Sequence, residues 1–397
     1  MSKLAERITH LSESQTIAMA KLSRELQDQG HDIISLSLGE PDFVTPSDIC
    51  ESAKKAIDDG FTKYTPIAGF ADLRKAISDK FKNENGLDYT PDQIVVSTGA
   101  KQSIANVVLS LVNPGEEVIV PSPYWVSYTQ MIKLAEGVPV FVTSSVETDY
   151  KVTAAQIRKA ITPKSKLLIF SSPCNPSGTV YTRDELLEIA KAVAEKEDLY
   201  IISDEIYEHI NFYGKHESIA QFDFIKERVI IVNGVSKGYA MTGWRIGYIG
   251  APKWIADACD KMQGQFTSGT SSISQKAATA ALKSGSGFYT EMCKTYLRRR
   301  NLVVNMLKEI KGLKVNIPMG AFYVFPDVSH FFGKTDGQTK IGNASDLCMF
   351  LLKDAGVSMV TGEAFGDTNC VRLSYATSDE LLVKAITRVK ESLAKLN

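Results

Sequence analysis

Short apolar runs alternate with helix-periodic segments through the middle of the chain. The runs QIVVSTG, EEVIVPSP, KLLIFSSP, LYIISDEIY and RVIIVNGVSK are rich in β-branched residues and lack polar alternation. Between them lie segments with apolar residues three and four positions apart, such as AKQSIANVVLSL and RDELLEIAKAVAEKE. Strands that are apolar on both faces need helices on both sides of their sheet. The pattern therefore predicts an α/β fold with a parallel or mixed sheet between helices.

The two ends of the chain have a different pattern. The first thirty residues are polar and helix-periodic, and they lead through an apolar strand, IISLSL, into the turn GEPDF. After the basic run RRR at 298–300, short strands such as AFYVF and CVRLSY alternate with helical segments, which is typical of a smaller α+β unit. We therefore predict an N-terminal arm at 1–46, a large domain at 47–295, and a C-terminal small domain at 296–397.

Composition and charge exclude several classes of protein. Of 397 residues, 44% are hydrophobic and 23% charged, which is ordinary for a globular protein. The formal net charge is −1, so no overall field favours nucleic acid or an anionic membrane. The N-terminus carries charges throughout, and no uncharged apolar run is long enough to span a bilayer, so we expect a cytoplasmic protein without a membrane partner. Six cysteines without CxxC or zinc spacing make a disulfide framework or a metal site unexpected.

Polar clusters follow the apolar runs at corresponding places. STGAK, SPYW, SSPCNPSG, SDEIY and NGVSK each come directly after a predicted strand. In open α/β sheets, ligands bind beyond the carboxyl ends of the strands. We therefore expect the clusters to converge on one site. In STGAK, backbone N–H groups at a helix start suit a phosphate, although glycine in such a turn also occurs for steric reasons alone.

Two clusters carry the sharpest chemistry. Asp204 ends an apolar strand, and it is either a strand-end cap together with Glu205 or a carboxylate held against a cationic ligand atom. Lys237 has small and apolar neighbours and no adjacent acid, so it is either a surface lysine or an amine whose pKa is lowered by desolvation. Together with Arg245, eight residues further on, these residues supply what a pyridoxal phosphate enzyme needs. The lysine would hold the aldehyde, and the aspartate would keep the ring nitrogen protonated.

The ordered motifs resemble one family over nearly the whole chain. They are SLGEPDF, KYTP, STGAKQ, PSPYWVSY, SSPCNPSG, SDEIYE, SKGYAMTGWRIGY, GAFYVF and VRLSYA. The chain resembles the fold-type I, class I pyridoxal phosphate aminotransferases, and among them the aspartate aminotransferases of the prokaryotic and plant-plastid branch. The resemblance implies a large cofactor-binding domain with a mostly parallel seven-stranded sheet, and a smaller α+β domain built from both chain ends. It also implies pyridoxal 5′-phosphate as cofactor and a homodimer with shared active sites.

The resemblance assigns the cofactor's reactive end. Lys237 matches the lysine that holds the cofactor aldehyde and then moves the substrate proton, and Asp204 matches the partner of the pyridine nitrogen. Tyr207 and Asn175 match the groups that hydrogen-bond the cofactor's phenolic oxygen. Trp125 resembles the aromatic residue stacked on the pyridine ring. The catalytic residues expected are therefore Lys237, Asp204 and Tyr207.

The phosphate residues follow in the same way. Arg245 matches the phosphate arginine, and Ala100 with Lys101 match the amides at the helix start. Tyr64 resembles the tyrosine that crosses to the other subunit's phosphate. Gly234 departs from the family, because many relatives carry a phosphate-binding serine there, so either Ser236 contributes instead or the phosphate relies more on Arg245 and the backbone.

Substrate recognition is assigned to both chain ends. Arg372 matches the arginine that binds the substrate α-carboxylate, and Gly39 the glycine whose backbone meets the same carboxylate. Trp125 and Asn175 are expected to contact substrate as well as cofactor.

The residue expected to bind the distal carboxylate of the substrate differs from that of the animal and enteric branch. In that branch, the role belongs to an arginine in the region matching 261–275. That stretch has no arginine here, and the resemblance gives the role to Lys101 with Gln15 and Thr16, unless Lys101 is only a solvated lysine. The expected reaction is ping-pong transamination of L-aspartate with 2-oxoglutarate to oxaloacetate and L-glutamate. Amination of prephenate to arogenate is a second hypothesis.

Other classes of protein share this scaffold. A broad-specificity aminotransferase, a C–S lyase or an aminocyclopropane-carboxylate synthase would keep Lys237 and Asp204, and product analysis separates them. The ligand domain of a bacterial regulator would need a DNA-binding module, and because the match begins within about forty residues of Met1, we do not expect one.

Overall fold

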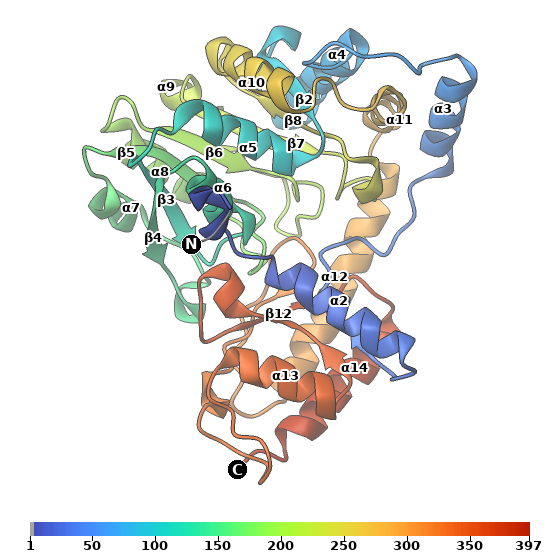
Figure 1. The fold of residues 1–397 in the computed structure, drawn as a ribbon, viewed down its shortest axis with the longest axis vertical. Helices are drawn as coiled ribbons and strands as arrows, with labels where there is room; N and C mark the ends of the chain where they lie inside the picture. The colour runs from blue at the N-terminus through green and yellow to red at the C-terminus, as the bar shows by residue number, and fades with distance from the viewer. Residues whose placement is uncertain (1–3) are drawn as a thin grey trace.

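A sheet of seven strands lies at the centre of the larger part of the molecule (Figure 1). The computed structural model describes residues 4–397. The strands are β2 Ile94–Ser97, β3 Glu117–Ser122, β4 Val138–Thr143, β5 Ser165–Ser171, β6 Tyr200–Asp204, β7 Val229–Gly234 and β8 Gly247–Gly250. Their order across the sheet is β2-β8-β7-β6-β5-β3-β4, and β8 runs antiparallel to its neighbours whereas the other pairs are parallel. The predicted mostly parallel seven-stranded sheet is confirmed.

Apart from the edge strand β4, which is partly exposed, the strands bury apolar side chains on both faces, and this explains their unbroken apolar sequence. In β2, Ile94 and Val96 pack in one core cluster, and Val95 between them packs in the other. One face is covered by α3 Ser47–Asp58, α4 Ala71–Lys80, α7 Ala154–Ala160, α8 Arg183–Ala194 and α11 Ser272–Lys283. The other is covered by α5 Ala100–Leu111, α6 Ser127–Leu134 and α10 Lys253–Phe266.

Both chain ends build the smaller part of the molecule. Strand β1, Ile34–Ser35, pairs in parallel with β10, Val357–Ser358. A second sheet has the order β11-β12-β9, with β11 Val360–Thr361, β12 Val371–Ser374 and β9 Tyr323–Val324. The accompanying helices are α2 Gln15–Asp28, α12 Gly287–Lys308, α13 Ala344–Asp354 and α14 Asp379–Leu393. Helix α12 runs between the two parts (Figure 1), so the predicted boundary at 295/296 falls within one helix and stays a prediction, as does that at 46/47.

The predicted strand IISLSL is shorter than expected. Only Ile34–Ser35 forms a strand, because the chain then changes partners. The Leu36 N–H donates to the Ser358 carbonyl, while the Leu36 carbonyl accepts from the Ser374 N–H of β12. This segment directs Gly39 toward the space between the two parts.

Four-residue α1, Glu6–Thr9, and α9, Asp223–Lys226, complete the α-helices of the described chain. Within residues 4–397, no helix combines the length and the apolar character needed to cross a membrane.

Candidate active site

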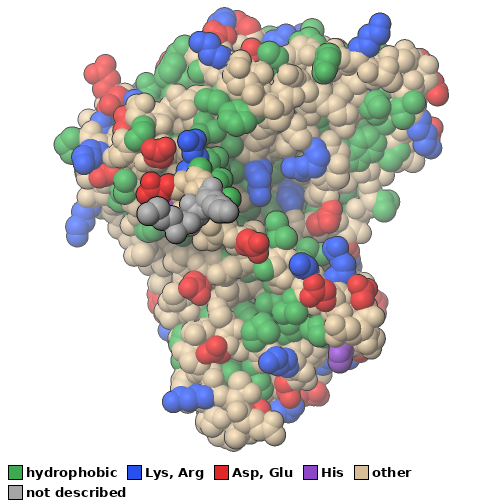
Figure 2. All heavy atoms as spheres, in the orientation of Figure 1, with side chains coloured by type: hydrophobic (Ala, Val, Ile, Leu, Met, Phe, Trp, Pro, Cys, Tyr) green, Lys and Arg blue, Asp and Glu red, His purple; other side chains and the backbone are tan. Residues whose placement is uncertain are grey.

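One cavity of about 360 Å³ collects the predicted residues at the carboxyl ends of the parallel strands. Figure 2 shows basic side chains gathered in a hollow between the two parts of the molecule. The predicted residues that line the cavity are Thr16, Gly39, Ala100, Lys101, Trp125, Asn175, Asp204, Tyr207, Ser236, Lys237, Arg245 and Arg372. Neither Gln15 nor Tyr64 lines it. The Tyr64 side chain is fully exposed in the single chain, and its role stays a prediction.

Lys237 follows strand β7 and extends into the cavity. Its amine donates a hydrogen bond to the Gly39 carbonyl oxygen, and the amine lies 5.7 Å from the centre of the Tyr207 ring. Burial of the amine lowers the pKa of Lys237 to about 8, and the positive charges of Arg372 and Arg245 contribute to this lowering. A lysine of this kind is partly neutral near physiological pH, and a neutral amine is a nucleophile toward carbonyl carbon.

Asp204 ends strand β6 and is only 5% exposed. Its carboxylate accepts a hydrogen bond from the Tyr128 hydroxyl at 2.7 Å and another from the Ile206 N–H at 3.3 Å. Burial raises the pKa of Asp204 to about 6, although the Tyr128 hydrogen bond lowers it in part. No lysine, arginine or histidine of residues 4–397 forms an ion pair with it. A buried carboxylate without a cation is suited to a cationic ligand atom.

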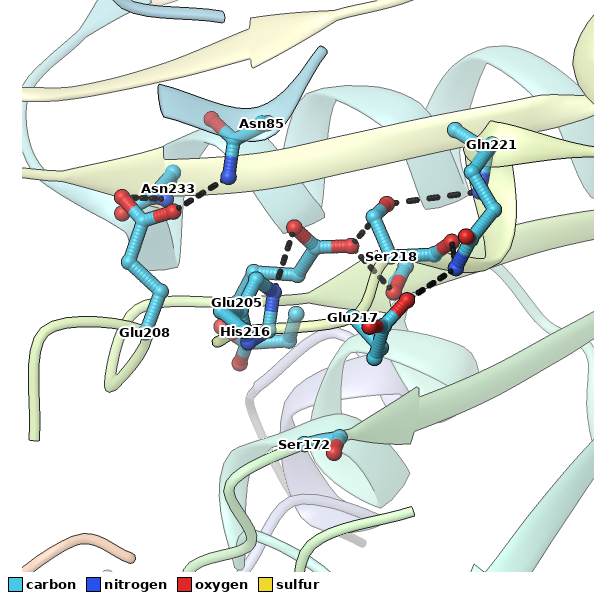
Figure 3. Close-up of polar contacts among 12 residues, drawn as sticks. Asn85, Ser172, Glu205, Glu208, His216, Glu217, Ser218, Gln221 and Asn233 are labelled. Carbon is cyan, nitrogen blue, oxygen red and sulfur yellow. Dashed lines mark hydrogen bonds and ion pairs between the residues drawn. The ribbon is translucent and has the colours of Figure 1, made fainter. Parts of the chain in front are cut away.

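The neighbouring acids of the SDEIYE motif belong to a different network, drawn in Figure 3. Glu205 accepts hydrogen bonds from the Ser218 hydroxyl at 2.6 Å and from His216 at 2.9 Å. Glu208 accepts from Asn233 at 2.7 Å and from Asn85, and it forms an ion pair with Lys80. These carboxylates have partners within the protein. Glu205 therefore has a structural role at the strand end, whereas Asp204 suits the other interpretation, a carboxylate held against a cationic ligand atom.

Another part of the cavity wall combines an arginine with the start of a helix, which suits an anion. Helix α5 starts at Ala100, so its free N–H groups open toward the cavity beside Arg245. A β-carbon on Gly234 would lie 2.7 Å from the Ile246 carbonyl oxygen, so this backbone leaves no room for a serine at this position. Ser236 lines the cavity instead.

Arg372 projects from strand β12 and is 2% exposed. Its guanidinium donates to Asn175 Oδ1 at 3.0 Å and to the Ser37 carbonyl at 2.6 Å. Its Nε is buried and has no hydrogen-bond partner in the described chain. A buried guanidinium with a free donor can bind a carboxylate in its planar fork.

The remaining wall contains Lys101, whose amine lies 5.2 Å from the Trp125 ring. Burial lowers the pKa of Lys101, and the Arg245 charge lowers it further. The Thr16 hydroxyl is buried, lines the cavity and lacks a partner within residues 4–397. Glu40 also lines the cavity, where it accepts a hydrogen bond from the Thr242 hydroxyl.

Sequence reasoning missed two tyrosines that touch predicted site residues. Tyr128 stands three residues after Trp125 in the motif PSPYWVSY, and Tyr323 is the tyrosine of GAFYVF. Both motifs were recognised, yet a buried tyrosine in such a segment has no local feature that distinguishes a core role from a site role. Tyr128 reaches Asp204, and Tyr323 reaches Tyr207 at 2.7 Å.

The cavity therefore has three places that suit three different chemical groups of a ligand. An aldehyde fits beside the Lys237 amine, a protonated ring nitrogen beside Asp204, and a phosphate beside Arg245 and the start of α5. The free Nε of Arg372 offers a fourth, for a carboxylate of a second ligand.

Comparison with known proteins agrees with this chemistry. The family model of class I and II aminotransferases matches residues 31–389. A bifunctional aspartate aminotransferase and glutamate/aspartate-prephenate aminotransferase of Petunia hybrida is 47% identical over 398 residues, covering 99% of this chain and 83% of its own. The crystal structure of the Rhizobium meliloti aspartate aminotransferase superposes with a TM-score of 0.96 at 39% identity, covering 100% of both chains. Thermus thermophilus aspartate aminotransferase with maleate gives a TM-score of 0.93 at 40% identity, covering 99% of this chain and 100% of its own.

Proposed function

Because the chain belongs to the class I and II aminotransferases, we propose that it transfers the amino group of L-aspartate to 2-oxoglutarate, giving oxaloacetate and L-glutamate, with pyridoxal 5′-phosphate as cofactor. The observation that carries the proposal is the meeting of Lys237, Asp204 and Arg372 in one cavity. When bound, pyridoxal phosphate supplies an electron sink for the pair released from the substrate Cα–H bond.

The chain's own residues account for the other requirements of the reaction. Lys237, with its pKa of about 8, can take the proton released from the substrate Cα at its neutral amine and pass it on within the same half-reaction. Asp204 holds a proton on the ring nitrogen through its negative charge. Arg372 orients the α-carboxylate and so places the substrate Cα near the lysine.

Preference for acidic substrates rests on Lys101 and Thr16. Both line the cavity, and the Thr16 hydroxyl has no partner in residues 4–397. An ammonium on a flexible stem can follow carboxylates of different reach. The Petunia relative is named for both aspartate and prephenate activities, and the Thermus structure was determined with maleate, a dicarboxylate. Amination of prephenate is therefore a second candidate activity.

A substrate panel tests this proposal. With 2-oxoglutarate as acceptor, we expect aspartate to turn over faster than alanine or phenylalanine, and prephenate with glutamate as donor measures the second activity. Lys101→Ala should lower kcat/KM for aspartate about 10- to 100-fold, the worth of a hydrogen bond to a charged group, and change alanine turnover much less. The exposed Lys164→Ala serves as the control. Faster turnover of alanine or phenylalanine than of aspartate in the wild type would contradict the acidic preference.

We also propose that the protein is a homodimer in which Tyr64 of the partner subunit completes the phosphate site. Support comes from the family resemblance of Tyr64 and from its full exposure in the single chain.

Mixed dimers test the shared site. Tyr64→Ala and Lys237→Ala chains, carrying different tags, are co-expressed and assayed at limiting cofactor. A mixed dimer has one site with both residues intact, so activity should recover to about a quarter of wild type, because half of random dimers carry one intact site. Activity no higher than the sum of the separate variants would argue against sharing.

A further inference from the structure

Tyr323 connects three of the predicted site residues, although no role was assigned to it from the sequence. It lies in strand β9, and its side chain has no solvent exposure. It contacts Tyr207, the proposed donor to the cofactor oxygen, and Arg372, the proposed ligand of the substrate carboxylate, and its hydroxyl also approaches Gly39. A residue that touches protein groups at both proposed ligand positions can hold these groups in one arrangement.

The contact with Tyr207 joins two hydroxyl groups at 2.7 Å. A hydroxyl has one proton to donate and two lone pairs that accept. If Tyr207 donates its proton to a ligand oxygen in the cavity, it can accept the proton of Tyr323. The two tyrosines then form a directed chain, and accepting a hydrogen bond makes the Tyr207 hydroxyl a stronger donor.

The contact with Arg372 uses the ring rather than the hydroxyl. The guanidinium carbon lies 4.6 Å from the centre of the Tyr323 ring and 4.8 Å from that of Phe365. Two aromatic faces attract the cation and restrict the guanidinium plane. The Nε left without a partner therefore keeps a defined direction.

The position of the Tyr323 hydroxyl depends on the absence of a side chain at Gly39. A β-carbon at residue 39 would lie 2.5 Å from the Tyr323 hydroxyl oxygen, so only glycine allows this approach. The Gly39 carbonyl is also the acceptor for the Lys237 amine. Gly39 therefore links Tyr323 to Lys237, the residue proposed to hold the cofactor.

We propose that Tyr323 is a positioning residue with two separable roles: its hydroxyl directs Tyr207 toward the phenolic oxygen of the cofactor, and its ring directs Arg372 toward the substrate carboxylate. The inference rests on the proposed aminotransferase function. Donors to the phenolic oxygen lower the pKa at which the visible absorbance of the bound cofactor changes, because they withdraw electron density from that oxygen. Weakening the Tyr207 donor must therefore raise this pKa.

Two substitutions separate the roles in the cofactor-loaded protein. Tyr323→Phe keeps the ring and removes the hydroxyl, so the absorbance pKa should rise by about half to one unit, the worth of one neutral hydrogen bond, while maleate affinity stays within about twofold. Tyr323→Leu removes both, so the same rise should come with roughly tenfold weaker maleate binding by calorimetry. Steady-state kinetics should show kcat falling in Tyr323→Phe and KM for aspartate rising as well in Tyr323→Leu.

Tyr375→Phe is the matched control, because this tyrosine is equally buried and donates to the Ala321 carbonyl at 3.2 Å without lining the cavity. Its absorbance titration and maleate affinity should match wild type. An unshifted titration in Tyr323→Phe, or unchanged maleate binding in Tyr323→Leu, would overturn the inference while the wild type still transfers amino groups. If wild type neither binds pyridoxal phosphate nor transfers amino groups, the proposed function itself fails.

Discussion

Lys237→Ala is expected to reduce amino transfer by about 10⁴-fold or more, since the substitution removes both the covalent anchor and the group that moves the proton. The pKa of Lys237 is lowered to about 8 by burial, so the amine is suited to both tasks near neutral pH. The measurement is the steady-state rate with aspartate and 2-oxoglutarate, together with the visible absorbance of protein incubated with pyridoxal phosphate.

Lys164→Ala, at an exposed lysine, is the control and should retain wild-type rate and absorbance. A Lys237→Ala protein that keeps the wild-type absorbance of the bound cofactor would refute the assignment. Added primary amine offers a second check, because a small amine that enters the cavity should restore part of the proton-transfer rate.

Asp204→Asn is expected to change activity and stability in opposite directions. With cofactor bound, the carboxylate attracts the protonated ring nitrogen by roughly 4 kcal/mol at about 4 Å and an effective dielectric near 20. Losing this attraction should lower kcat about 10³-fold, since each 1.4 kcal/mol is about a factor of ten. Tyr128 and the Ile206 N–H remain in place, so the shape of the site should be kept.

Without cofactor, the same substitution should stabilise the protein. The folded state raises the pKa of Asp204 from 3.8 to about 6, so the folded state binds the proton more tightly than the unfolded chain. Stability therefore falls as pH rises from about 4 to about 6, and the cost of roughly 3 kcal/mol is complete above that window. Asp204→Asn removes this cost.

Urea unfolding of cofactor-free wild type and Asp204→Asn at pH 4.5 and 7.5 measures the effect. The variant should be more stable than wild type by up to about 3 kcal/mol at pH 7.5 and by much less at pH 4.5. Asp223→Asn, at the start of the surface helix α9, is the control and should behave like wild type at both pH values. Equal free energies of unfolding for wild type and Asp204→Asn at pH 7.5 would contradict this prediction, because they would show that burying the ionised Asp204 carboxylate does not destabilise the cofactor-free protein.

The sheet was predictable because its signal is local. Strands buried on both faces must be apolar at every position, and the polar residues that follow them must lie at one edge of the sheet. The sequence IISLSL was predicted too long, since the chain leaves β10 for β12 after Leu36. That change of partner depends on segments more than three hundred residues away.

In the site, too, some features were predictable from local sequence and others depended on packing. The neighbours of Lys237 and the strand before Asp204 were enough to indicate a desolvated amine and a buried acid, and the motifs then indicated the family. The sequence did not decide which of Asp204 and Glu205 has a structural role and which can bind a ligand, because either role suits an acid at a strand end. The packing decided between them: Tyr128 meets Asp204, while Ser218 and His216 meet Glu205.

The sequence by itself determined the α/β sheet, the single site at its strand ends, and the amine and acid of that site, because periodicity and strand-end chemistry are local features of the sequence. The roles of the arginines came from the family resemblance. Only the tertiary structure decided that Tyr323 contacts both Tyr207 and Arg372, and that the buried Nε of Arg372 has no hydrogen-bond partner within residues 4–397. Tyr207 and Tyr323 are 116 positions apart in the chain. Their contact follows from how the two parts of the molecule pack, and no local pattern of residues encodes that packing.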